Sequence, residues 1–127
     1  MRWNDILFEV NEIQWNVEQI STYQEDLTHL LISSGLESKD KSIRIANEEK
    51  RVVSLLHTGR MDSINRPHKI EPHKGPFKPY SKGSSEIWDL HLLSPKSKYI
   101  MLIAKFSKER KYVLLSIGEE AYINKKM

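Results

Sequence analysis

The chain has 127 residues, of which 29% are charged and 39% hydrophobic, and its formal net charge is +3. This size and composition are typical of one folded domain with a core and argue against wholesale disorder. The absence of cysteine excludes disulfides, thiolate metal sites and cysteine nucleophiles, and it suits a reducing cytoplasm. No apolar run approaches the ~20 residues of a membrane-spanning helix, and the N-terminus lacks the apolar region of a signal peptide. We therefore expect a cytoplasmic protein without a membrane partner.

The charges are unevenly distributed along the chain. Residues 1–57 carry 6 Lys or Arg and 10 Asp or Glu, a balance of −4, whereas residues 58–127 carry 14 and 7, a balance of +7. A basic second half favours a polyanionic partner. The alternative is a dipolar protein whose charges are simply solvated.

The first half has the periodicity of helices. Apolar residues recur every three or four positions over residues 3–33, as one face of a helix requires. A break is expected near Ser21, where the spacing of a capping box occurs, and Gly35 is expected to end the second piece. The same periodicity returns over residues 41–57. Residues 1–57 are therefore predicted to contain a helical hairpin.

Residues 58–85 have a different character. They contain four of the five prolines and three of the five glycines, so no helix can run through them and no central strand is expected. Cations gather in this predicted loop, with Phe77 and Tyr80 among them. Loops of this length inside a compact domain are more often functional or disordered than structural. The spacing of His68 and His73 is a poor metal signal in a chain without cysteine, so no metal site is predicted.

Residues 86–118 consist of three apolar runs separated by two short polar turns, which predicts an antiparallel β-meander. In the first run, alternation directs the larger apolar residues toward the helices and leaves Asp89 and His91 on a partly polar face. The run at residues 99–106 is apolar on both faces, so we expect it to be the central strand.

The predicted fold class is therefore α+β, with an N-terminal helical hairpin packed on an antiparallel meander of at least three strands. We expect a single domain over residues 1–127. Its parts are the helical half (1–57), the basic loop (58–85), the meander (86–118) and a polar tail (119–127).

Basic side chains with interleaved aromatic rings suit single-stranded nucleic acid, because cations neutralise phosphates and rings stack on bases. Cleavage of RNA by its own 2′-hydroxyl would need a base, a proton donor and cations for the phosphorane charge. The candidates for proton transfer are His91, His73, Tyr80 and Tyr122. The candidates for binding the substrate are Arg60, Arg66, Lys74, Lys78 and Lys82. For each of them the plainer alternative is a surface cation or a strand-edge side chain, and no cofactor is expected.

A family resemblance rests on the run EIWDLHLLSPKSKYIMLIAKFSKERKYVLLSIGEE and its flanks, roughly residues 78–122. This pattern of strand and turn resembles the RelE/ParE superfamily of bacterial toxins, which are small, basic ribosome-dependent ribonucleases or, in the ParE branch, gyrase poisons. Lys78 and Lys82 match the lysines that precede the family's first meander strand, and Tyr122 could replace its C-terminal tyrosine. The resemblance implies a metal-independent endoribonuclease that acts on mRNA at the ribosome and is held inactive by a cognate antitoxin.

The chain departs from that family at three places. Asp89 lies close to the position at which the family has an arginine on its first meander strand. Glu119 and Glu120 follow Gly118, where the family has a basic residue. The family usually opens with a strand, where this chain shows helical periodicity. An alternative from another class therefore stays open, namely a non-enzymatic inhibitor or adaptor of phage or plasmid type that docks through its acidic helices or its basic loop.

Overall fold

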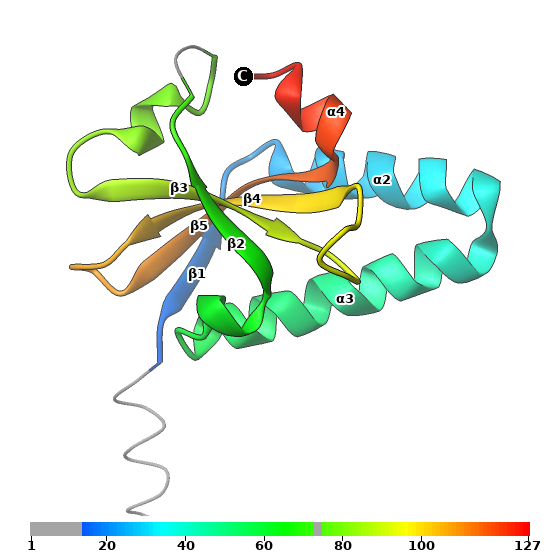
Figure 1. Ribbon diagram of the computed structural model, residues 1–127, viewed down its shortest axis with the longest axis horizontal. Helices are drawn as coiled ribbons and strands as arrows, with labels where there is room; N and C mark the ends of the chain where they lie inside the picture. Colours follow the sequence, from blue (N-terminus) through cyan, green and yellow to red (C-terminus); the bar gives the residue numbers. More distant parts are fainter. Residues whose placement is uncertain (1–13, 73–74) are drawn as a thin grey trace, which may run out of the picture.

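The computed structural model describes residues 14–72 and 75–127. Its five strands form one sheet in the order β1–β5–β4–β3–β2, with a helical hairpin against one face (Figure 1). No helix in the described ranges is both long enough and apolar enough to cross a membrane. The elements are β1 (Asn16–Gln19), α2 (Tyr23–Glu37), α3 (Lys39–His57), η1 (Met61–Ser63), β2 (Asn65–Ile70), η2 (Lys78–Ser81), β3 (Ser85–His91), β4 (Tyr99–Phe106), β5 (Lys111–Glu119) and α4 (Glu120–Asn124).

The predicted helical hairpin is confirmed as α2 and α3. Ser38 separates them and caps α3, since its hydroxyl accepts a hydrogen bond from the backbone N–H of Lys41 at 3.3 Å. Gly35 lies inside α2 instead of ending it. A β-carbon there would be 3.6 Å from Ser42, and the Ser42 hydroxyl donates to the Leu31 carbonyl at 3.1 Å. The two helices therefore pack closely near this glycine.

The hairpin follows a strand, which corrects the prediction of helix over this part of the chain. Residues 16–19 form β1, which pairs parallel with β5, with Asn16 opposite Lys111. The ring of Trp15 stacks on Tyr112 with centroids 4.7 Å apart. Pairing with a distant strand and burial against it outweigh a local helical periodicity. The earlier part of the predicted helix, residues 3–13, lies outside the described residues.

The meander is confirmed as β3, β4 and β5, and β4 is the central strand of the sheet. Part of the predicted loop forms a fourth antiparallel strand, β2, which pairs with β3. Pro67 is compatible with this strand because β2 lies at the edge of the sheet, where a missing N–H costs little. The register shifts between Asn65 and His68, so the strand is irregular around the proline.

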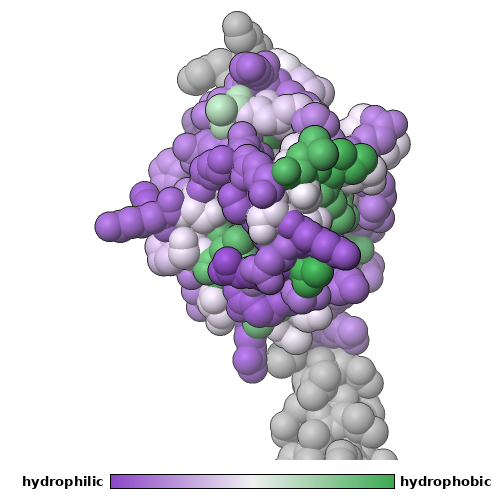
Figure 2. Space-filling model, turned by 90° about the vertical axis from the view of Figure 1, so that its right-hand side faces the viewer, coloured by the Kyte–Doolittle hydropathy of each residue, from purple (hydrophilic) through white to green (hydrophobic). Residues whose placement is uncertain are grey.

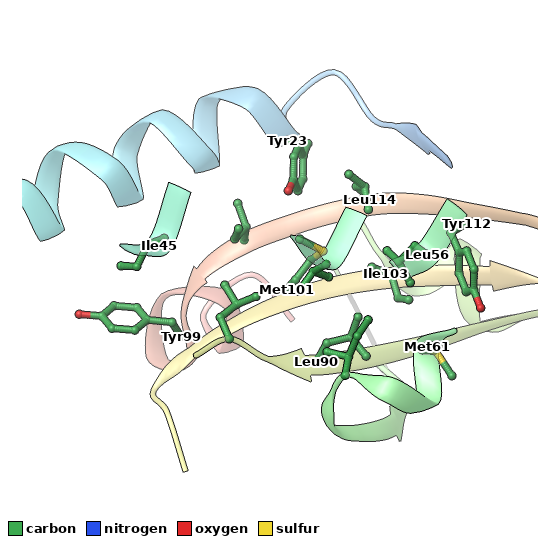
Figure 3. Packing of buried hydrophobic residues seen from close by; sticks show 14 of the residues in the cluster. Tyr23, Ile45, Leu56, Met61, Leu90, Tyr99, Met101, Ile103, Tyr112 and Leu114 are labelled. Carbon is green, nitrogen blue, oxygen red and sulfur yellow. The ribbon is translucent and has the colours of Figure 1, made fainter. Parts of the chain in front are cut away.

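Apolar clusters cover both faces of the sheet. On the helix side, side chains of α2 and α3 pack on those of the strands, as Figure 3 shows for Ile45 above Tyr99 and for Leu56 beside Ile103. On the other side, Phe77 from the segment before η2 and Ile123 from α4 cover the sheet. Burial on both faces explains why the runs of β4 and β5 are almost entirely apolar.

Candidate active site

A hollow of about 660 Å³ opens where the β3–β4 turn meets the edge strand β2 and the start of α4. It collects charged and titratable side chains that the sequence distributes over more than fifty positions. The residues that line it are Arg66, Pro67, His68, Asp89, His91, Lys96, Ser97, Lys98 and Glu120.

His91 lies in this hollow at the end of β3, and its ring is oriented by the backbone. Its Nδ1 is 2.9 Å from the carbonyl oxygen of Ser97. A carbonyl can only accept, so Nδ1 must carry the hydrogen. The neutral ring then has its lone pair on Nε2. His91 is therefore held in the tautomer that can take a proton at Nε2.

Asp89 and His68 form a cross-strand pair beside His91. The two residues are opposite each other in the β2–β3 register, and Nδ1 of His68 is 3.9 Å from Oδ2 of Asp89. The Asp89 side chain is 14% exposed and that of His68 is 73% exposed. Burial raises the pKa of Asp89, while His68, His91 and Arg66 oppose the rise.

One oxygen of Asp89 is poorly satisfied. Its Oδ1 is buried and has no hydrogen-bond partner among the described residues. An unpaired buried carboxylate oxygen costs stability, and such features tend to be kept where a group has a functional task. The observation marks Asp89 as a functional candidate in its own right.

Three cations surround these groups, and they come from two separate segments. Arg66, on β2, donates from Nη1 to the carbonyl of Pro95 at 3.2 Å. Lys96 and Lys98 belong to the β3–β4 turn, and the Lys98 amine is 2.9 Å from Oε1 of Glu119. Glu120 also lines the hollow with its carboxylate. The lining side chains therefore carry charges of both signs, with more cations than carboxylates.

The turn that contains Lys96 and Ser97 is held in place by a hydrogen bond to a buried carboxylate. Glu48 on α3 is 8% exposed, and its Oε2 accepts from the backbone N–H of Leu93 at 2.6 Å. Leu93 has a φ of 74°, a left-handed conformation that costs energy in a leucine. Arg51 donates to both oxygens of Glu48, at 2.7 and 3.1 Å, and holds the pKa of that carboxyl below its usual value. This arrangement positions the turn, and the Ser97 carbonyl orients His91.

The structure brings only some of the sequence-predicted residues together. His91 and Arg66 line this hollow. Tyr122 lines a different one and donates to Asp26 at 3.0 Å. The predicted residues at other positions, none of which lines the hollow, are Tyr80 and Lys78 in η2, Lys82 after η2, and Arg60 before η1. His73 and Lys74 lie outside the described residues.

Sequence reasoning missed His68, Lys96 and Lys98 as site members. His68 was considered only for its spacing from His73, because a proline-broken segment was predicted to be loop. The two lysines could have been found, since they lie in the short turn that directly follows His91. Nothing local indicated that β2 would pair with β3 and place His68 opposite Asp89. In the described ranges, no group of three or more His, Asp or Glu side chains is arranged to hold a metal ion.

Comparisons with known proteins find one solved structure with a similar arrangement of elements. No family model matches the chain, and no curated protein matches it. Among solved structures it is similar to a chain in the crystal structure of the archaeal RelE–RelB complex from Pyrococcus horikoshii OT3, with 13% identity and a TM-score of 0.49. The match covers 84% of this chain and 94% of that chain. This similarity concerns the arrangement of the elements alone.

Proposed function

We propose that the protein is a RelE-like toxin that cleaves RNA without a metal ion, through the hollow at His91. His91 accepts the proton of a ribose 2′-hydroxyl at Nε2, and O2′ attacks the adjacent phosphorus. The bond from phosphorus to the 5′-oxygen breaks, and protonated His68 gives its proton to that oxygen. The products are a 2′,3′-cyclic phosphate and a 5′-hydroxyl. The hydrogen bond from His91 Nδ1 to the Ser97 carbonyl carries the proposal, because it sets the base in the competent tautomer.

The cations and Asp89 complete this assignment. Arg66, Lys96 and Lys98 stabilise the charge that develops on the non-bridging oxygens. Asp89 lies opposite His68 on the neighbouring strand, with its Oδ2 3.9 Å from Nδ1 of His68, so it can orient the ring of the proposed acid. Messenger RNA on the ribosome is the proposed substrate and an antitoxin is the proposed partner. Both follow from the sequence resemblance to the RelE/ParE superfamily.

The test is cleavage of a single-stranded oligoribonucleotide, with and without ribosomes, in the presence of a chelator. His91→Gln and His68→Gln should each lower the rate about 100-fold, whereas His57→Asn, remote from the hollow, should leave it unchanged. A substrate with sulfur in place of the bridging 5′-oxygen needs no acid, so it should restore the His68 variant and not the His91 variant. Equal cleavage of the 2′-deoxy substrate, or full activity of both glutamine variants, would refute the proposal.

A second candidate function is a binding protein without catalysis. Three large hydrophobic side chains of the described residues are mostly exposed, and all lie toward the far end of the hairpin: Ile32 (61%), Leu36 (85%) and Ile43 (52%). Figure 2 views this end and shows hydrophobic side chains among polar ones. Harmless expression in cells, together with salt-sensitive RNA binding and no cleavage, would favour this function. Growth arrest that His91→Gln relieves would favour the toxin.

A further inference from the structure

The side of the helical hairpin that faces away from the sheet, here called the outer face, has an exposed apolar centre. Ile32 and Leu36 on α2 and Ile43 on α3 form it, and Figure 2 shows hydrophobic side chains at this end of the molecule. Each of the three stands two positions from a buried residue of its own helix. Two positions are about 200° around an α-helix, so these side chains point away from the core.

The antiparallel register of the hairpin places these residues at matching heights. Near the tip, a β-carbon on Gly35 would be 3.6 Å from Ser42, and toward the other end the Tyr23 hydroxyl donates to Glu49 at 2.9 Å. By this register Ile32 is level with Ile43. The apolar centre therefore extends across both helices.

Charged side chains flank the apolar centre on the same face. Glu25 and Lys50 are each two positions from a buried residue of their own helix, and the register sets them level with each other. At the tip, Leu36 is level with Lys39. The three charged residues are exposed, and none of them forms an ion pair within the part of the chain that the structure describes. Their charges are therefore available to a partner.

We propose that a second copy of the chain covers the outer face, with α2 of each copy packed on α3 of the other. The symmetry axis is a two-fold parallel to the helices. It sets Ile32 over Ile43 of the second copy and Glu25 over Lys50 of the second copy. Leu36 then lies over the aliphatic stem of Lys39 of the second copy, which can cover apolar surface while its amine stays in water. Each contact occurs twice.

The charges select this arrangement over the other two-fold packing of the same face. If α2 packed on α2 and α3 on α3, the register would bring Lys39 to Lys50 of the second copy and Glu25 to Leu36. Opposed like charges and a carboxylate against an apolar side chain are both unfavourable. In the proposed arrangement Glu25 meets a cation instead. The outer face is thus complementary to itself, as an isologous dimer requires.

The size of the face predicts a weak dimer. With 15 residues, α2 is about 22 Å long, and two packed helices are about 20 Å wide. The contact is then on the order of 450 Å² per copy, at the low end of specific interfaces. We expect a dissociation constant on the order of 10 to 100 µM.

The dimer leaves the candidate active site open. Leu90 packs under the hairpin, whereas Asp89 and His91 alternate to the opposite face of the sheet, where their hollow lies. The inference therefore does not depend on the proposed function, and its test needs no RNA.

The first test is sedimentation velocity of the full chain from about 1 to about 500 µM, a range that spans the expected dissociation constant. Monomer should change to dimer over this range. Leu36→Glu should weaken the dimer more than tenfold, because it sets a carboxylate in the apolar centre. Leu36 is 85% exposed, so the variant should keep the circular dichroism and melting temperature of the parent. Lys108→Glu, exposed in the β4–β5 turn, is the charge-changing control and should dimerise like the parent.

The second test mixes two charge variants. Glu25→Lys and Lys50→Glu each set like charges opposite one another, so each alone should dimerise about tenfold more weakly. In an equimolar mixture both contacts between the two variants join opposite charges, and the heterodimer should regain about the parent affinity. A chain that stays monomeric throughout would leave this face to another protein and overturn the proposal. Normal dimerisation of Leu36→Glu, or a mixture no more dimeric than its components, would overturn it too.

Discussion

The amine of Lys126 lies 2.8 Å from Oδ1 of Asp26, a carboxylate on α2 that is 4% exposed and a hundred positions earlier in the chain. The hydroxyls of Ser116 and Tyr122 donate to the same carboxylate at 2.8 and 3.0 Å. Asp26 thus joins α2, β5 and the end of the chain. Because α4 begins at Glu120, which lines the candidate active site, this cluster also holds one wall of that site.

Asp26→Ala should lower the free energy of unfolding by about 2 kcal/mol, because it leaves the partly buried amine of Lys126 and two hydroxyls without their acceptor. Urea unfolding measures the change. Glu25→Ala, on the exposed side of the same turn, is the control and should stay within about 0.5 kcal/mol of the parent protein. A similar small loss for both variants would show that the cluster does not fasten α4.

Glu48→Ala should lower the free energy of unfolding by about 2 kcal/mol, since the partly buried N–H of Leu93 loses its acceptor. Glu48→Gln keeps an acceptor and should lose less. Arg51 lowers the pKa of Glu48 in the folded protein, so the carboxylate stabilises the fold above its ordinary pKa of 4.5, and this contribution is lost as the pH falls toward the folded value. The stability difference between the parent protein and Glu48→Gln should therefore shrink on acidification. A difference that is independent of pH would contradict this prediction.

Asp89→Asn should raise the stability of the protein at neutral pH and lower its rate of RNA cleavage. Burial raises the folded-state pKa of Asp89, so the ionised form costs stability above that value and the cost is relieved as the pH falls. Thermal unfolding at two pH values tests the sign, and the gain should be larger at the higher pH. Asp62→Asn, at an exposed position, is the matched control. Loss of stability at neutral pH would show that Asp89 is a structural ion-pair partner instead of a strained functional group.

The rate of RNA cleavage should depend on pH as a bell-shaped curve, because one histidine must be neutral and the other protonated. His91→Gln should remove the acidic limb and His68→Gln the basic limb. His57→Asn, which does not line the hollow, should keep both limbs and serves as the control. Exchange of the two limbs between the variants would reverse the assigned roles of acid and base.

Gly59→Ala should destabilise the protein by about 2 kcal/mol more than Gly83→Ala does. Both glycines have positive φ, 71° and 68°, so the free-energy cost of placing an alanine in left-handed backbone is similar in the two variants. A β-carbon at Gly59 would lie 2.6 Å from Nε1 of Trp15, whereas the space at Gly83 is open. Chemical unfolding of the two variants measures the difference. Equal losses would show that Trp15 can move away without cost.

The sequence predicted the half-polar face of β3 correctly because alternation is a local property of a strand. Asp89 and His91 were expected together and do share one hollow. The partner of Asp89 could not be predicted in the same way. His68 reaches it only through the pairing of β2 with β3, and the register shift near Pro67 decides which residue stands opposite. The opposite holds for Tyr122. Its residue type suggested a role in proton transfer, but in the structure its hydroxyl donates a hydrogen bond to the buried carboxylate of Asp26.

The sequence by itself determined the helical hairpin, the meander and the central place of β4, because each follows from the periodicity of apolar residues in a short window. Only the tertiary structure decided that residues 16–19 form a strand beside β5, that β2 closes the other edge, and that Glu48 supports the turn after His91. These features join residues far apart in the chain. Their free energy comes from hydrogen bonds and burial between the joined segments, and no local window contains both partners.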